Sequence, residues 1–167
     1  MSGPQQRDIR GVMITVSQGR LLLPNASVAE VITFSDPEPV ENAPDWMLGQ
    51  IRWRGWRLPL LSFSRFADWS DTEASTGAKV VVLKALGGNP RLPYFAMLSQ
   101  GFPRLVTVSH DALQESHSVK ELPLGIYSMV TLNGDPAAVP DLLSLELLID
   151  KAVNKAACAT GSTPVAV

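Results

Sequence analysis

Residues 51–61 read IRWRGWRLPLL, and this stretch is the clearest guide to the fold class. Apolar and polar residues largely alternate over residues 51–54, which is the period of a strand with one buried face. Gly55 can take a positive φ and so favours a tight turn, and residues 56–61 continue as a second run rich in apolar residues. The stretch therefore predicts a β-hairpin.

The same pattern of two apolar runs around a turn occurs three more times. Thirteen prolines and twelve glycines punctuate short runs of Val, Ile, Leu and Thr, which is typical of a chain with many short strands. Asn133-Gly134 is the strongest local hairpin signal in the chain. The three predicted hairpins lie at residues 11–24 with Gly19 in the turn, at residues 79–98 with Gly87 and Gly88, and at residues 129–140.

Three segments depart from the strand pattern. Residues 67–78, ADWSDTEASTGA, are polar and acidic, which predicts an exposed connector. Over residues 141–153 the apolar side chains recur at helical spacing, and Asp141 or Ser144 is suited to cap the start of a helix. Residues 154–167 are rich in Ala, Thr and Ser and predict a disordered tail. The apolar positions of the predicted C-terminal helix are Leu142, Leu145, Leu148 and Ile149.

The composition excludes several classes of protein. Apolar residues make up 46% of the chain and charged residues 18%, yet no apolar run reaches the ~20 residues that cross a bilayer, so no insertion into a membrane is expected. The N-terminal residues lack the features of a secretory signal, which predicts a cytoplasmic protein. The net charge of −2 argues against general binding to nucleic acid. Cys158 is a single cysteine, so a disulfide within the chain and a cluster of thiolate ligands are both excluded.

Few residues are candidates for catalysis or for metal binding, and their spacing fits no known site. Ser109, His110 and Asp111 are adjacent, whereas a nucleophile, its base and an orienting acid must converge in space. No glycine-rich loop lies between a strand and a helix. The sequence therefore predicts no catalytic residue, no metal site and no cofactor. The other side chains considered as metal ligands, all without the regular spacing of a known site, are His117, Glu115 and Glu121.

Residues 52–57 form the one conspicuous cluster, with three arginines and two tryptophans around Gly55. The tryptophans fit a structural role in a β core, with the arginines facing water. The same residue types are also those most enriched in the hot spots of protein interfaces. A third interpretation is a single-stranded nucleic-acid site, in which indoles stack on bases and arginines follow the phosphates.

Two stretches of the first half resemble the CheW-like domain family. GRLLLP at residues 19–24 and VAEVI at residues 28–32 resemble its opening, in which a strand ending in Leu-Pro leads to a Val-x-Glu-Val/Ile-Ile segment. PVENAPDWMLGQIRWRGWRLPLL at residues 39–61 resembles the family's Pro-x-x-x-Ala-Pro, Gly-x-Ile, Arg-Gly and Pro-aliphatic-aliphatic series with the same spacings. The second half, to Leu148, resembles the family more loosely.

The resemblance implies a mainly β fold. The implied fold has two SH3-like five-stranded β-barrel subdomains that share a core, followed by a C-terminal helix. Together they form a single domain over residues 7–153. We expect the first barrel at about 14–66, the connector at 67–78, the second barrel at about 79–140 and the helix at about 141–153. These boundaries leave open whether the barrels exchange strands.

The resemblance also implies a non-catalytic adaptor at chemoreceptor arrays. In the family, one subdomain pairs with the regulatory domain of a CheA-like histidine kinase, and the cytoplasmic tip of a methyl-accepting chemoreceptor lies in the groove between the subdomains. Arg54 matches the arginine of the family's Arg-Gly pair, and its planar guanidinium suits a carbonyl or carboxylate. The residues expected to bind partners are Val28, Glu30, Ile32, Arg52, Trp53, Arg54, Gly55 and Trp56.

Two positions depart from the family pattern. The family often has Asn where this chain has Arg52, and Asp where it has Ser62. The added bulk and charge of Arg52, Trp53 and Trp56 suggest an auxiliary adaptor, of an array controlling type IV pili, rather than the principal flagellar coupler. A small β-barrel protein that binds single-stranded nucleic acid through residues 52–57 is the alternative, and an enzyme that uses residues 109–111 is the third hypothesis.

Overall fold

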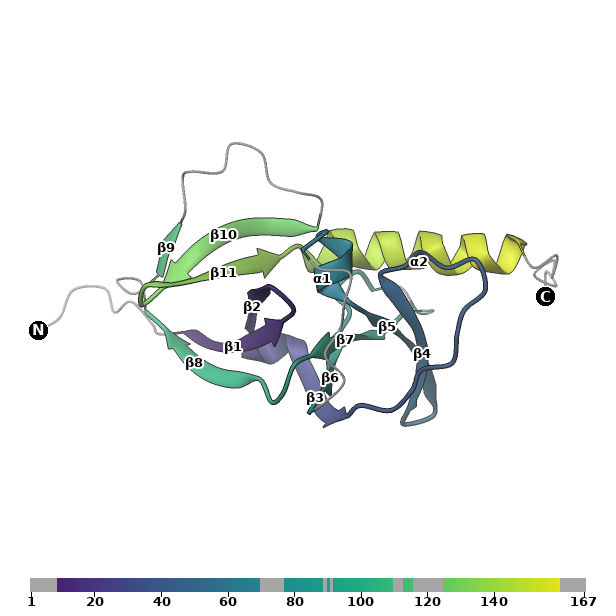
Figure 1. Ribbon diagram of the computed structural model, residues 1–167, viewed down its shortest axis with the longest axis horizontal. Helices are drawn as coiled ribbons and strands as arrows, with labels where there is room; N and C mark the ends of the chain where they lie inside the picture. The colour runs from purple at the N-terminus through teal and green to yellow at the C-terminus, as the bar shows by residue number, and fades with distance from the viewer. Residues whose placement is uncertain are drawn as a thin grey trace, which may run out of the picture.

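The computed structural model describes residues 9–69, 77–88, 90, 92–109, 113–115 and 125–159. Over these residues the chain forms two β-sheets, a 3-10 turn η1 (Asn25–Ser27), a one-turn helix α1 (Phe63–Phe66) and a long helix α2 (Leu142–Ala159). Figure 1 shows the two sheets side by side, with α2 extending from the end of one sheet over the other. The predicted fold class, mainly β with a C-terminal helix, is confirmed.

The first sheet has six strands in the order β8-β1-β2-β11-β10-β9. Two antiparallel hairpins, β1 with β2 and β10 with β11, form its centre. They are joined by a parallel contact that places Ala138 of β11 beside Leu21 of β2. The strands are β1 (Ile9–Val16), β2 (Gly19–Pro24), β8 (Arg104–Val108), β9 (Leu113–Glu115), β10 (Ile126–Leu132) and β11 (Asp135–Pro140).

The second sheet has five strands in the order β3-β6-β7-β5-β4. It contains the hairpins β4 with β5 and β6 with β7, so all four hairpins predicted from the sequence are confirmed. β5 and β7 run parallel, with Leu60 opposite Ala96. The strands are β3 (Val28–Thr33), β4 (Met47–Trp53), β5 (Trp56–Leu61), β6 (Lys79–Lys84) and β7 (Tyr94–Ser99).

The sheets divide the chain differently from the expected boundaries at 14–66 and 79–140. The N-terminal hairpin β1–β2 belongs with β8–β11, while β3–β7 form the other sheet on both sides of the connector. One sheet accordingly has six strands rather than five. The physical reason is the pairing of β2 with β11, a contact between distant segments that no local pattern in the sequence encodes.

Both faces of each sheet bury apolar side chains. In β6 the side chains of Val81 and Leu83 enter a core shared by both sheets and α2, while Val80 and Val82 enter a separate core of the five-stranded sheet. Because successive side chains of a strand point to opposite faces, a strand buried on both faces has a continuous apolar run. The shared core joins the two sheets into one structural unit.

Helix α2 closes one side of the shared core with Leu142, Leu145 and Ile149. Its start is capped as predicted, because the Asp141 carboxylate accepts hydrogen bonds from the Ser144 amide at 3.2 Å and from the Ser144 hydroxyl at 2.8 Å. The helix ends at Ala159 rather than near residue 153. Residues 154–159, expected to be disordered, are helical because the Ala- and Lys-containing sequence continues to favour a helix. Residues 160–167 lie outside the described part of the chain.

The turn between β1 and β2 differs from the expectation for Gly19. Gln18 takes the positive φ of 66°, and Gly19 is not in the left-handed region. A β-carbon at position 19 would instead overlap the ring of Trp69. Gly19 therefore allows the close approach of an indole rather than the turn itself.

Candidate protein-binding site

The tip of the β4–β5 hairpin is a two-residue turn closed by the pair Trp53 and Trp56. Arg54 has a φ of 48° and Gly55 a φ of 82°, and positive φ at both central residues is the signature of a type I′ turn. Such turns match the right-handed twist of the strands, so the tip extends the hairpin without a bend. Arg54 and Gly55 are both exposed.

Glu30 on β3 fixes this tip through both of its carboxylate oxygens. Oε2 accepts a hydrogen bond from the indole Nε1 of Trp53 at 2.5 Å, and Oε1 accepts one from Nη2 of Arg54 at 3.1 Å. β3 and β4 are the two outer strands of the five-stranded sheet. Because Glu30 joins residues at these opposite edges, the sheet must curl like a barrel wall.

The contacts also keep Glu30 charged. The pKa of Glu30 is lowered from its ordinary value of 4.5, first by the hydrogen bond from Trp53 and then by the hydrogen bond and positive charge of Arg54. Partial loss of water around the carboxylate opposes this shift. The net direction is downward, so Glu30 is an anion at neutral pH.

The two tryptophans of the cluster have different roles. Trp53 is 7% exposed and packs in the core of the five-stranded sheet, with its ring centroid 4.9 Å from that of Tyr94. Trp56 is 43% exposed, and its ring centroid lies 6.5 Å from that of Tyr94. The guanidinium of Arg54 lies 4.9 Å from the Trp53 ring centroid, within the range of a cation–π contact. Trp53 therefore supports the tip, while Trp56 is available at the surface.

The other residues expected to bind partners also separate into two groups. Arg52 is exposed, and its Nε lies 3.8 Å from a carboxylate oxygen of Glu38. Val28 and Ile32 are only partly buried, Val28 against the shared core and Ile32 against the core of the five-stranded sheet. The structure thus brings Glu30 to the hairpin tip and leaves Val28 and Ile32, also on β3, partly buried against the two cores. Partner binding by all eight residues stays a prediction.

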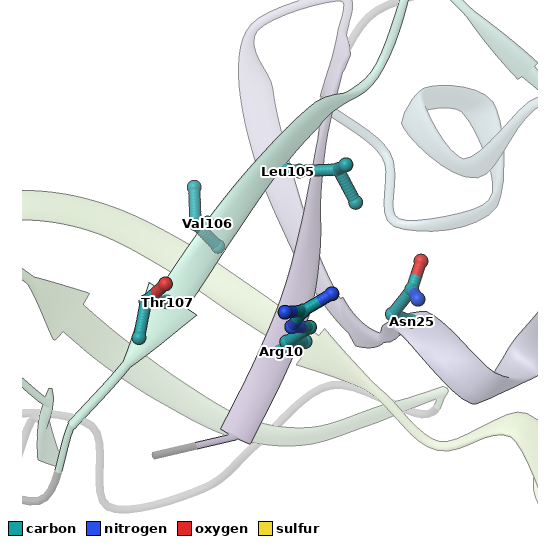
Figure 2. A pocket seen from close by; sticks show the side chains of 5 residues that line it. All are labelled: Arg10, Asn25, Leu105, Val106 and Thr107. Carbon is teal, nitrogen blue, oxygen red and sulfur yellow. The ribbon is translucent and has the colours of Figure 1, made fainter.

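A shallow hollow of about 300 Å³ lies at the tip and is lined by residues 52–57. A second hollow, of about 220 Å³, lies between η1 and the edge of the six-stranded sheet. Figure 2 shows Arg10 and Leu105 on neighbouring strands of that edge, with Asn25 on the other side of the hollow. This second hollow was not predicted from the sequence, because β1 and β8 meet only in the folded chain.

The second hollow continues the shared core to the surface. Leu105 lies opposite Val12, and Thr107 lies opposite Arg10, in the β1–β8 pair. Directly opposite residues point to the same side of a sheet, and Val12 is a buried member of the shared core. Leu105 is nevertheless 74% exposed, so this apolar face of the six-stranded sheet extends to an edge that is open to solvent.

The residues considered from the sequence as catalytic or metal-binding lie largely outside the described part of the chain. Ser109 lies within the described part, whereas His110, Asp111, His117 and Glu121 lie outside, as does the side chain of Glu115. Among the described residues, no group of three or more His, Cys, Asp or Glu side chains is placed to hold a metal ion. None of the described helices is long and apolar enough to cross a membrane.

Comparisons with known proteins agree with this architecture. The sequence model of the CheW-like domain family matches residues 10–149. The fold is similar to the crystal structure of the scaffolding protein TtCheW from Thermoanaerobacter tengcongensis, with a TM-score of 0.68 and 11% sequence identity over 85% of this chain and 90% of that one. No curated protein sequence matches the chain. Because the family match extends over most of the chain and over both sheets, the protein belongs to the CheW-like domain family.

Proposed function

We propose that this protein is a non-catalytic adaptor that couples chemoreceptor signalling domains to a CheA-type histidine kinase. It would act in the cytoplasm, at receptor arrays. Membership of the CheW-like domain family supports the general role. The observation that carries the proposal is the hairpin tip, where Glu30 holds Arg54 in one orientation on an exposed turn.

This geometry suits protein recognition because the side chain is already ordered before a partner arrives. A free arginine loses rotamer entropy when it binds, whereas Arg54 is restrained by Glu30 and by the face of Trp53. Its side chain is still 66% exposed, so guanidinium donors face the solvent. They are available to a carbonyl or carboxylate of the kinase regulatory domain.

The second hollow is the proposed site for the receptor tip. The family resemblance implies that this helical tip binds in the groove between the subdomains, and the position of the hollow, where the shared core reaches the surface, supports the proposal. Leu105 offers an exposed apolar contact beside Arg10. An adaptor with two separate surfaces can hold receptor and kinase at the same time.

We also propose that the array controls type IV pili. The exposed Arg52 and Trp56 at the tip support this proposal by analogy, because the family often has Asn in place of Arg52. A surface with more charge and bulk favours a different set of partners from those of the principal flagellar coupler.

The central test compares Arg54→Asn with a matched control. Asn tolerates the left-handed backbone of the turn, so the variant removes the guanidinium without changing the hairpin. Arg20→Gln removes another exposed arginine, whose ion pair with Asp135 lies on the six-stranded sheet. We expect Arg54→Asn to reduce capture of the kinase in a pull-down from the native cytoplasm by roughly tenfold, the usual loss at an interface hot spot, and Arg20→Gln to leave it unchanged. Failure of the wild type to capture either a kinase or a receptor would contradict the proposal.

Single-stranded nucleic acid is the competing partner. It requires exposed aromatic platforms, and burial of Trp53 leaves Trp56 as the exposed indole of the cluster. Retention of the wild type on immobilised oligo-dT that falls steeply with salt would favour this function. Absence of such retention, together with capture of the kinase, would exclude it.

A further inference from the structure

Two arginines lie directly opposite each other on the β4–β5 hairpin. The strand register pairs Arg52 with Arg57, and both side chains are exposed. Opposite residues of an antiparallel pair point to the same side of the sheet, so the two guanidinium groups share one surface. Like charges in this arrangement destabilise a hairpin. The pair of Arg52 and Arg57 therefore destabilises the fold of the free protein.

Neighbouring carboxylates only partly balance these charges. Glu38 approaches Arg52 at 3.8 Å, but the side chains are 57% and 74% exposed, and such pairs are weak in water. Glu30 is already engaged by Trp53 and Arg54. In the part of the chain that the structure describes, no ion pair involves Arg57. The hairpin thus presents an excess of positive charge although the whole chain has a net charge of −2.

The pair lines the shallow hollow of about 300 Å³ at the tip. A local arrangement that disfavours the fold is expected at functional sites, where a partner compensates for it. Two adjacent guanidinium groups match an acidic surface, because each can hold a carboxylate through paired N–H donors.

From these observations we infer that Arg52 and Arg57 form a clamp for a carboxylate-rich surface of a partner protein. The inference rests on the proposed adaptor function and adds the chemistry of the partner at the hairpin. A protein carboxylate is favoured over a nucleic-acid phosphate because Trp56 alone offers an exposed ring in the cluster, and the chain as a whole is acidic. The clamp lies on the strands, whereas Arg54 lies in the turn between them.

The test titrates the full chain with an oligo-glutamate peptide and, separately, with oligo-dT, following the arginine Nε–H signals by NMR. The variants are Arg57→Gln, Arg52→Gln and the matched control Arg20→Gln. We expect oligo-glutamate to shift the Arg52 and Arg57 signals, and Arg57→Gln to weaken its binding roughly three- to tenfold, while Arg20→Gln leaves binding unchanged. Because Arg57→Gln also removes the like-charge pair, the melting temperature of the free variant should rise.

Several results would overturn the clamp. They are binding of oligo-dT in preference to oligo-glutamate through the same arginines, no binding of oligo-glutamate by the wild type, and unchanged binding in Arg57→Gln. A lower melting temperature in Arg57→Gln would assign the pair a structural role and would also overturn the clamp. The adaptor function is tested separately by the pull-down: capture of a kinase with equal efficiency by wild type and Arg57→Gln would retain that function and reject only the clamp.

Discussion

The backbone of Arg54 has a left-handed conformation that few residues other than glycine adopt. Its φ of 48° matches that of Asn133, which holds the same place in the type I′ turn of the β10–β11 hairpin. Asn is a common choice there, whereas a left-handed residue with a long side chain is disfavoured by about 1–2 kcal/mol. The contacts of the Arg54 side chain with Glu30 and Trp53 offset part of this strain. Strain retained at an exposed position is consistent with a role in binding.

The ionisation of Glu30 gives a prediction at the residue scale. Its pKa is lower in the folded protein than in the unfolded chain, so its contribution to stability is complete above the unfolded value of about 4.5 and disappears as the pH falls through the folded value. We expect urea unfolding of the wild type and of Glu30→Gln to differ most near neutral pH and to converge in acid.

The cause of this pKa shift can be checked separately. Trp53→Phe keeps an aromatic ring in the core but removes the indole N–H, the largest cause of the shift. The pKa of Glu30, followed by NMR of its side-chain carboxyl carbon, should therefore rise toward 4.5 in this variant. Titration of Glu30 at its ordinary value in the wild type would contradict the described contacts.

Among the elements, α2 is attached to the five-stranded sheet by a polar contact as well as by the shared core. Glu146 is only 7% exposed, and its carboxylate accepts hydrogen bonds from the amides of Leu86 and Gly87, the latter at 2.7 Å. A β-carbon at Gly87 would lie 2.7 Å from Oε2 of Glu146, so a larger residue would displace the carboxylate from its present position. The contact fixes the turn after β6 against the helix.

Loss of this contact removes two backbone hydrogen bonds to a carboxylate. We expect Glu146→Ala to lower the free energy of unfolding by about 1.5–3 kcal/mol, the usual net contribution of a hydrogen bond to a charged group. Glu146→Gln retains one carbonyl oxygen as an acceptor and should be less damaging. Denaturant unfolding measures both effects, and hydrogen exchange should speed up at the amides of Leu86 and Gly87 in the Ala variant. Equal stability of Glu146→Ala and the wild type would show that the contact contributes little.

Whole elements could be predicted from the sequence, whereas contacts between distant elements could not. Hairpins and the capped helix were predictable because their signals, such as Asn133-Gly134 and Asp141, are local. The exposed turn at Arg54 was predictable for the same reason. The contact of Glu30 with this turn joins residues 24 positions apart across two sheet edges, and the hollow at Leu105 depends on two distant strands. Such contacts depend on the tertiary fold, which a single sequence read by local pattern does not specify.

At the scale of the whole molecule, the two sheets depend on each other. Their shared core combines side chains of β1, β2, β6 and β7 with Leu145 and Ile149 of α2, which are 1% and 0% exposed. Neither sheet can bury this face alone. We infer that both sheets unfold in one cooperative step.

Ile149→Ala tests this cooperativity. Removing buried methyl groups from a packed core costs about 2–5 kcal/mol. The loss should lower the protection of amides in β1 and β6 equally when native-state hydrogen exchange is followed across both sheets. The control is Leu147→Ala on the exposed side of α2, where the side chain is 65% exposed and the cost should stay below about 0.5 kcal/mol. Weakening of the β6 amides alone would show that the sheets unfold separately.

The pairing of β2 with β11 also has a consequence for synthesis on the ribosome. The β1–β2 hairpin leaves the exit tunnel early. Its parallel neighbour β11 begins only at Asp135 and is therefore made much later. The strands β3–β7 are consecutive in the chain, but the face of their sheet that enters the shared core stays uncovered until β11 and α2 have also been made. Nascent chains that end just after β7 should therefore still be sensitive to proteases and bind chaperones, and stable folding should begin only once α2 has left the tunnel.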